Sequence, residues 1–238
     1  MSNAKARLSQ VIFGKPQFRD CPGCNLVLQI PRLIVDCDEG YRYWSDGKVD
    51  TDDLPFFVTS ARCPACETPF RLEDVTCKRI DRRSGGKRPL SVERLNSSDY
   101  RRLIDAMDSA GNVSGEKSVR IEYWHHLNDA RRSGHHRKRP VVGSLWRIAR
   151  ELNLLRLLEL FDLAVPGDLV KKGEALRELG RFDDCLEILA DTPDKYRWIA
   201  GLIATHAAAG NEELFGLLKT PEGWHPLTPL PLARRPRN

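Results

Sequence analysis

Four cysteines stand in two closely spaced pairs, Cys21-Pro-Gly-Cys24 and Cys63-Pro-Ala-Cys66. The two intervening residues let the chain turn back, so that both sulfurs of a pair face one point, and proline fixes one backbone angle of that turn. Four thiolates complete the tetrahedral coordination of a Zn²⁺ ion and leave no position open for water or substrate. The spacing therefore predicts one zinc ion held by Cys21, Cys24, Cys63 and Cys66 in a structural rather than a catalytic site.

Two other chemistries use cysteine pairs of this spacing, namely thiol–disulfide exchange and iron–sulfur binding, and both stay open at this point. The odd total of seven cysteines argues against a framework in which every cysteine forms a disulfide. Cys37, Cys77 and Cys185 lack a partner at ligand spacing, and we interpret them as small buried or half-buried residues.

The 38 residues between the two pairs read as β-structure. Residues 25–30 are largely apolar, and Asp46-Gly47 is a strong signal for a tight hairpin turn. An aromatic strand follows the second pair at residues 69–72. This pattern predicts a β-rich zinc ribbon over residues 20–77, with an extra hairpin in its spacer and an N-terminal extension at residues 1–19.

The composition changes after the predicted ribbon. Residues 78–96 are basic and contain glycine, as expected of a linker. Residues 97–219 read as helices, with an N-cap cluster at Ser97–Asp99. Residues 220–238 form a tail rich in proline and arginine, which we expect to be extended. The sequence thus predicts an α+β protein in which a zinc ribbon precedes an all-α domain.

One predicted helix, over residues 144–163, carries two apolar stripes displaced around its cylinder. A helix with two apolar sides is expected at the centre of a stack. The first stripe comprises Leu145, Ile148, Ala149, Leu152 and Leu155, and the second comprises Leu154, Leu157, Leu158 and Phe161.

A preceding helix presents Arg120, Trp124, Asn128 and either Arg131 or Arg132 on one face at helical spacing. This face can serve a partner, but we interpret Trp124 as a core anchor and Asn128 or an arginine as a tie to a neighbouring loop. A second metal site is not indicated, because adjacent histidines on a helix point about 100° apart and no carboxylates accompany them. The histidines concerned are His125, His126, His135 and His136.

The segment GEALRELGRFDDCLEIL, residues 173–189, resembles a tetratricopeptide repeat at the turn between its two helices. Gly180 matches the glycine of that turn, Phe182 the aromatic residue that follows, and Cys185 the small residue where the helices touch. A weaker second copy covers residues 198–218, with its turn at a second glycine, Gly210. Fewer than three repeats cannot bury a core alone, so the preceding helices are expected to complete it.

Taken together, the paired CPxC motifs, the YWSDGKVDTDDLP spacer and the EALRELGRFDD turn resemble a group of uncharacterized bacterial proteins. These proteins join an N-terminal zinc ribbon to C-terminal tetratricopeptide-like helices, and the resemblance covers most of residues 20–218. It implies an architecture and no particular reaction.

The sequence contains no phosphate-binding loop, nucleophile elbow or zinc-hydrolase helix, and no small-molecule substrate is evident. We therefore predict a non-enzymatic adaptor or scaffold with an unidentified protein partner. The alternative is a nucleic-acid-associated factor, which the net charge of +5 permits. Its contacts would come from the basic segments 78–88 and 131–139. We expect such binding to be weak, because no aromatic residues interleave with these charges.

No apolar run reaches the length needed to cross a bilayer, and the N-terminus lacks the apolar segment of a secretory signal. The sequence therefore predicts a cytoplasmic protein without a membrane partner.

Overall fold

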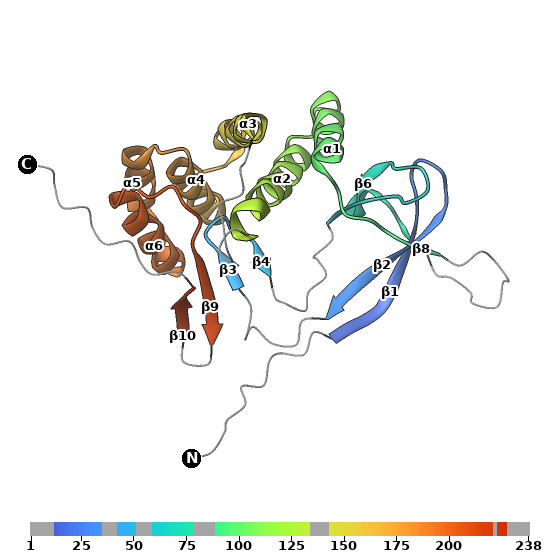
Figure 1. Cartoon of the computed structure of the whole chain (residues 1–238), viewed down its shortest axis with the longest axis horizontal. Coiled ribbons are helices and arrows are strands. Elements are labelled where there is room, and N and C mark those ends of the chain that lie inside the picture. The colour runs from blue at the N-terminus through green and yellow to red at the C-terminus, as the bar shows by residue number, and fades with distance from the viewer. Residues whose placement is uncertain are drawn as a thin grey trace, which may run out of the picture. The chain divides into compact units, whose positions relative to one another are not determined.

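The computed structural model describes residues 12–34, 42–50, 59–78, 89–133, 143–220 and 223–227. The chain forms two compact units, whose elements are labelled in Figure 1. We call them the cysteine unit, Met1–Gly40 with Asp50–Asn112, and the helical unit, Tyr41–Val49 with Val113–Asn238. The two units are therefore interleaved along the sequence, whereas the sequence analysis expected one domain to follow the other.

The cysteine unit contains two small antiparallel hairpins, each closed by one of the CPxC pairs. A four-stranded sheet has the order β7-β1-β2-β8, and a separate pair of strands consists of β5 and β6. The elements are β1 (Ile12–Asp20), β2 (Val27–Ile34), β5 (Ser60–Arg62), β6 (Pro69–Arg71), the 3-10 helix η1 (Leu72–Asp74), β7 (Cys77–Lys78), β8 (Leu90–Ser91) and α1 (Ser97–Ser109).

The core of the cysteine unit lies directly behind the cysteines. Leu28 and Ile30 are two residues apart on β2, so their side chains point to the same side of the strand, and both are buried. They pack with Phe70 of β6, and the same cluster includes the buried sulfurs of Cys21 and Cys63. The other buried members of the cluster are Ala61 and Val92.

Helix α1 begins at Ser97, so its cap lies one residue before the predicted cap cluster Ser97–Asp99. Asn96 is the N-cap, and its side-chain oxygen accepts hydrogen bonds from the backbone N–H groups of Ser98 (2.8 Å) and Asp99 (3.1 Å). The Asp99 carboxylate accepts in return from the backbone N–H of Asn96, which completes a capping box. Helix α1 belongs to the cysteine unit, whereas the sequence placed it in the helical domain.

The described residues of the helical unit form five α-helices and a small four-stranded sheet. The sheet has the order β10-β9-β3-β4, so two strands come from near the C-terminus and two from the CPxC spacer. The elements are β3 (Arg42–Trp44), β4 (Val49–Asp50), α2 (Val113–Ser133), α3 (Ser144–Leu160), α4 (Pro166–Glu178), α5 (Phe182–Ala190), the 3-10 helix η3 (Asp194–Tyr196), α6 (Arg197–Ala208), β9 (Gly216–Thr220) and β10 (Gly223–Pro226).

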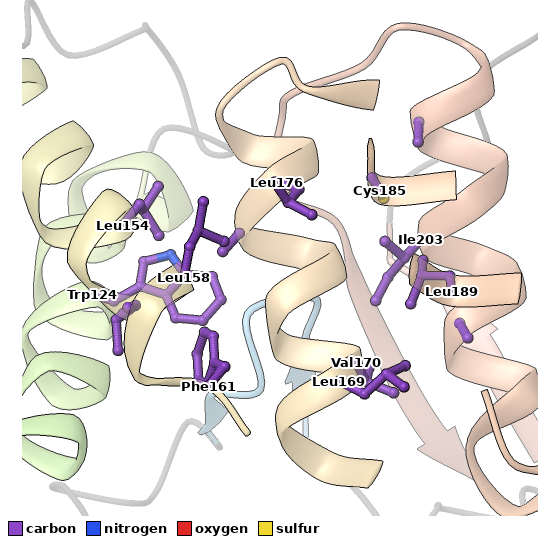
Figure 2. Close-up of a cluster of buried hydrophobic side chains, with 14 of the residues drawn as sticks. Trp124, Leu154, Leu158, Phe161, Leu169, Val170, Leu176, Cys185, Leu189 and Ile203 are labelled. Atoms are coloured by element: carbon purple, nitrogen blue, oxygen red, sulfur yellow. The ribbon is translucent and has the colours of Figure 1, made fainter. Parts of the chain in front are cut away.

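The central helix of this unit is α4, which contacts α3, α5 and α6. Figure 2 shows Trp124, Leu158 and Phe161 on one side of α4 and Cys185, Leu189 and Ile203 on the other. The approach of α5 is close, because a Cβ atom added at Gly173 of α4 would lie 2.6 Å from Leu189 of α5. A larger residue at position 173 would therefore push the two helices apart.

The expectation that residues 144–163 form a helix at the centre of a stack is correct in part, since α3 contacts α2 and α4, but only one of its two apolar stripes is covered. One stripe of α3 is buried as predicted, with Leu154, Leu157, Leu158 and Phe161 in the core. The other stripe faces outward, and Leu145 and Leu152 are among its exposed members. Two apolar stripes do not by themselves show that both are covered.

The predicted second copy of the helix pair is also wrong beyond its first helix. Gly210 adopts a positive φ of 63° and ends α6, as expected of a C-terminal glycine. The following residues, however, form strand β9 instead of a second helix, and Leu217 pairs with Tyr43 across the sheet. The cause is tertiary, since Phe215 and Leu217 are buried by the core and the spacer strand.

The predicted Asp-Gly hairpin exists but lies in the helical unit and not in the zinc ribbon. Its turn is closed by a hydrogen bond from the N–H of Trp44 to the carbonyl of Lys48 (2.8 Å), and Gly47 has a φ of 84°. Asp46 is fully buried, where its carboxylate pairs with Arg132 and accepts a hydrogen bond from Asn128 Nδ2 (2.9 Å). This confirms that Asn128 and an arginine tie down a neighbouring loop.

No described helix combines the length and the apolar composition that a crossing of the bilayer requires.

We predict that Asp46→Ala lowers the free energy of unfolding of the helical unit by about 3 kcal/mol, because it removes the buried counter-charge of Arg132 and leaves this guanidinium only its ion pair with the partly exposed Asp129 (2.6 Å). Urea unfolding followed by circular dichroism measures the change. Glu187→Ala, an exposed position on α5, serves as the control and should change stability little. Adding Arg132→Met to Asp46→Ala should recover part of the loss, and a purely additive double variant would contradict a direct charge pairing.

We also predict that the helical unit loses stability as the pH falls from about 6.5 toward 4. Burial and the nearby charge of Arg177 lower the pKa of His206 to about 4, whereas the unfolded chain takes up this proton near pH 6.5. The stabilising contribution of neutral His206 is therefore present above pH 6.5 and disappears on acidification. Urea titrations at pH 7.5 and pH 5 should show a smaller difference for His206→Gln than for the wild type, while the exposed His225→Gln should behave like the wild type.

Candidate metal centre

The sulfurs of Cys21, Cys24, Cys63 and Cys66 lie together, all within 4.8 Å of one another. The Sγ atoms of Cys21 and Cys66 are 3.5 Å apart, and those of Cys24 and Cys63 are 3.8 Å apart. The closest approaches therefore join one hairpin to the other. Each hairpin supplies one buried and one exposed cysteine, so the centre lies at the edge of the core.

The two CPxC turns have nearly the same backbone conformation. In the first, the N–H of Cys21 donates to the carbonyl of Leu26 (2.8 Å) and the N–H of Asn25 donates to the carbonyl of Cys21 (2.9 Å). In the second, Cys63 bonds in the same way to Thr68 and Glu67. Both turns thus bring their second cysteine back over the first.

Both turns contain a residue in the left-handed conformation directly after the second cysteine. Asn25 and Glu67 each have a φ of 57°. Asparagine tolerates this region better than most residues, whereas glutamate pays a larger steric penalty there. The Glu67 carbonyl is held by a hydrogen bond from Arg102 of α1 (3.2 Å), so α1 supports the strained turn.

Backbone N–H groups point at the buried sulfurs. The N–H of Gly23 lies 3.3 Å from the Sγ of Cys21, and the N–H of Ala65 lies 3.4 Å from the Sγ of Cys63. Such bonds stabilise negative charge on sulfur, which is the form that binds a metal. The two turns are therefore preorganised for thiolates.

The protonation of the sulfurs depends on their surroundings. Hydrogen bonds from the hydroxyl and the backbone N–H of Thr68 lower the pKa of Cys66 to about 6, and its Sγ lies 3.2 Å from the Thr68 hydroxyl oxygen. Burial raises the pKa of Cys21 to about 12. The contacts with Thr68 thus favour the thiolate form of Cys66, whereas burial favours the thiol form of Cys21, which would lose its proton to a metal that binds.

The separations between the sulfurs are those of a reduced cluster, since a disulfide requires about 2.05 Å and the cysteines here are free thiols. A zinc ion with four Zn–S bonds of about 2.3 Å holds its sulfurs about 3.8 Å apart in a tetrahedron. A cluster of several irons places metal and sulfide between its ligands and separates the cysteines further. The geometry therefore fits a single four-coordinate ion.

The packing around the first turn is tight on one side. A Cβ atom added at Gly23 would lie 2.3 Å from the Oγ1 of Thr68 and 3.3 Å from the Sγ of Cys66. The equivalent position of the second turn holds Ala65, which is exposed. Only the first turn thus requires glycine, because Thr68 of the second turn fills the space beside it.

The remaining cysteines and histidines do not join this centre. Cys185 is buried in the helical core, as predicted, and burial raises the pKa of its thiol to about 12. The interpretation of Cys77 is wrong, since this residue is exposed and its Sγ lies 3.6 Å from Gln17 Oε1. His125 lies 3.0 Å from the backbone carbonyl of Asp46 through its Nε2. Cys37, His135 and His136 are outside the described residues.

The predicted face of α2 is an internal contact. Trp124 is fully buried in the core, which confirms its role as an anchor, and its Nε1 donates to Glu178 (3.2 Å). Asn128 Nδ2 donates to the same carboxylate (3.1 Å), and Arg131 forms an ion pair with it (3.0 Å). The sequence did not identify Glu178 as the common acceptor, because a buried glutamate at position 178 looks like any polar residue of a helix.

Part of the second basic segment is used internally. Arg131 and Arg132 pair with buried carboxylates and so are not directed at an external phosphate. The remaining residues of that segment, 134–139, and most of the first basic segment, 79–88, are outside the described residues.

Comparison with protein-family models, with curated proteins and with solved structures finds no match to this chain. The assignment of a site therefore relies on the geometry of the chain itself.

We predict that Gly23→Ala weakens metal binding by about 1–3 kcal/mol, because the added methyl group collides with Thr68 and disturbs its contact with Cys66. Competition with a chromophoric chelator measures the affinity. Ala65→Ser, at the equivalent exposed position, should bind as the wild type does. Combining Gly23→Ala with Thr68→Ala removes the collision and should restore part of the affinity. Equal losses of metal affinity in Gly23→Ala and Ala65→Ser would argue against a steric cause.

Proposed function

We propose that Cys21, Cys24, Cys63 and Cys66 hold one structural zinc ion. The observation that carries this proposal is the clustering of four thiol sulfurs at separations that suit one tetrahedral ion. Four thiolates occupy every position of such an ion, so its role is to join the two hairpins. The buried cluster behind the site is small, and a domain of this kind draws much of its stability from the metal.

The purified protein should contain about one zinc per chain by elemental analysis. Cys21→Ser combined with Cys63→Ser should lose the metal and the protease resistance of the cysteine unit. The variant should keep most of its helical circular dichroism, because α2 to α6 belong to the other unit. Iron in place of zinc would contradict the metal assignment, and full loss of helicity would show that the helical unit needs the ion.

We further propose that the protein acts as a non-enzymatic adaptor or scaffold for a protein partner. The pair α4–α5 supports a tetratricopeptide-like interpretation, since Gly180 has a φ of 73° at the turn and Gly173 lies against Leu189. Helical pairs of this kind serve as binding platforms in many proteins. A cytoplasmic location agrees with the four reduced cysteines of the centre.

An exposed aromatic cluster supports a binding role for the helical unit. Trp198 of α6 and Trp224 of β10 stack with centroids 4.6 Å apart and are 43% and 37% exposed. Tyr43 of β3 meets Trp224 edge to face at 4.8 Å. Tryptophan and tyrosine are the residues most enriched among the energetic centres of protein interfaces. Three segments distant in the sequence thus form one surface that suits a protein partner.

Affinity capture with the full chain tests the adaptor proposal, provided that nuclease and a salt series are included. Partners that survive both treatments and are lost with Trp198→Ala support an adaptor that uses this cluster. Leu90→Ala, an exposed apolar position in the cysteine unit, is the matched control and should retain them. Partners lost on nuclease treatment or at moderate salt would instead favour the nucleic-acid-associated alternative.

A further inference from the structure

The four sulfurs of the candidate metal centre form two contacts between the hairpins. The Sγ of Cys21 lies 3.5 Å from the Sγ of Cys66, and the Sγ of Cys24 lies 3.8 Å from the Sγ of Cys63. Each contact joins a buried cysteine to an exposed one. An oxidant in solvent can therefore reach one sulfur of each contact, and the buried sulfur beside it is placed to resolve the product as a disulfide.

The contact between Cys21 and Cys66 is the better placed of the two for this chemistry. Its separation of 3.5 Å lies at the limit of about 3–3.5 Å at which two atoms are ready to react. Cys66 is exposed, and the hydroxyl oxygen of Thr68 lies 3.2 Å from its sulfur. A hydroxyl at this distance can stabilise negative charge on the sulfur, which is the form that attacks an oxidant. We therefore expect Cys66 to react first and Cys21 to resolve it.

The oxidant with the simplest balance is hydrogen peroxide. The sulfur of Cys66, as thiolate, attacks one peroxide oxygen, the O–O bond breaks, and hydroxide leaves with the electron pair, so that Cys66 becomes a sulfenic acid. The sulfur of Cys21, also as thiolate, then attacks the sulfur of Cys66, and the S–O bond breaks with loss of a second hydroxide. Two protons from solvent convert the hydroxides to water. The two cysteines lose two electrons and the peroxide gains them.

The disulfide between Cys21 and Cys66 has two consequences for the cysteine unit. Thiolates are the metal ligands, so oxidation of two of the four removes half of the coordination and releases a bound ion. The same disulfide joins one hairpin to the other, as the ion does. A disulfide within either CPxC pair would also remove two ligands, but it would leave the hairpins without a covalent link.

We propose that the four-cysteine centre is a peroxide-sensitive thiol switch, in which a Cys21–Cys66 disulfide, followed by a Cys24–Cys63 disulfide, replaces the metal as the link between the hairpins. The switch rests on the zinc site proposed above and is independent of the adaptor role. Oxidation releases the ion while the cysteine unit stays folded, because the cross-links hold the hairpins over the same buried cluster. Reduction restores the thiolates and the metal site.

Peroxide titration of the full, zinc-loaded chain tests the switch. A chromophoric chelator measures zinc release, and peptide mapping without reductant locates the disulfides. Trypsin cuts on both sides of each CPxC pair and yields residues 20–32 and 63–71 as separate peptides. After one equivalent of peroxide these two peptides should be joined through Cys21 and Cys66, and the zinc should be released. Dithiothreitol with added zinc should restore one ion per chain, and the oxidised protein should keep the protease resistance that the Cys21→Ser, Cys63→Ser variant loses.

Two variants show which residues act. Thr68→Val removes the hydroxyl beside Cys66 and should slow zinc release at fixed peroxide roughly fivefold without changing the zinc content. Cys77→Ser removes an exposed cysteine outside the centre and should release zinc as fast as the wild type.

Three outcomes contradict parts of the proposal. Peptides that stay separate, each with its own internal disulfide, would overturn the cross-link between the hairpins. Zinc that stays bound until the cysteines reach sulfinic or sulfonic acid would overturn the switch. A chain without zinc before peroxide is added would contradict the metal assignment, and the disulfide map of its free thiols would still decide the pairing of the sulfurs.

Discussion

The buried carboxylate of Asp46 is the contact on which the organisation of the chain depends. A charge without solvent is costly unless it is paired and hydrogen-bonded, and here Arg132 and Asn128 supply both. Attraction to Arg132 and the hydrogen bond from Asn128 outweigh the effect of burial and lower the pKa of Asp46 to about 2. The hairpin that carries Asp46 is therefore held in the helical unit, although it lies between the two CPxC turns in the sequence. The proposed metal ion would close the loop that carries the hairpin, and this would reduce the conformational entropy lost when the hairpin docks.

Glu178 plays a corresponding part inside the helical unit. Its carboxylate accepts from Trp124 and Asn128 and pairs with Arg131 and Arg150. Apolar packing alone allows helices to slide against one another, whereas a shared buried carboxylate has partners in one register. The network therefore fixes how α2, α3 and α4 meet. The carboxylate of Glu178 is engaged by four side chains, so we assign it no acid–base role.

The candidate metal centre and the exposed aromatic cluster belong to different units of the chain. Four sulfurs at the edge of a small core suit an ion that stabilises the cysteine unit. The aromatic cluster around Trp224 and the apolar face of α3 lie in the helical unit, on separate elements. The surface proposed to bind a partner protein is therefore distinct from the proposed metal centre.

Local features of this protein follow from the sequence alone. The CPxC spacing identifies the four clustered cysteines, Asp46-Gly47 identifies a hairpin, and Gly180 identifies the turn between two helices, because each depends on residues adjacent in the chain. The sequence also determined a mixed α and β composition. Tertiary structure decided the rest: which unit receives the hairpin, why the chain after Gly210 forms a strand, and which stripe of α3 is covered. Periodicity shows that a face is apolar, but it does not show what covers it. Strand pairing with a distant segment and the charge partner of a buried carboxylate exist only after the chain has folded.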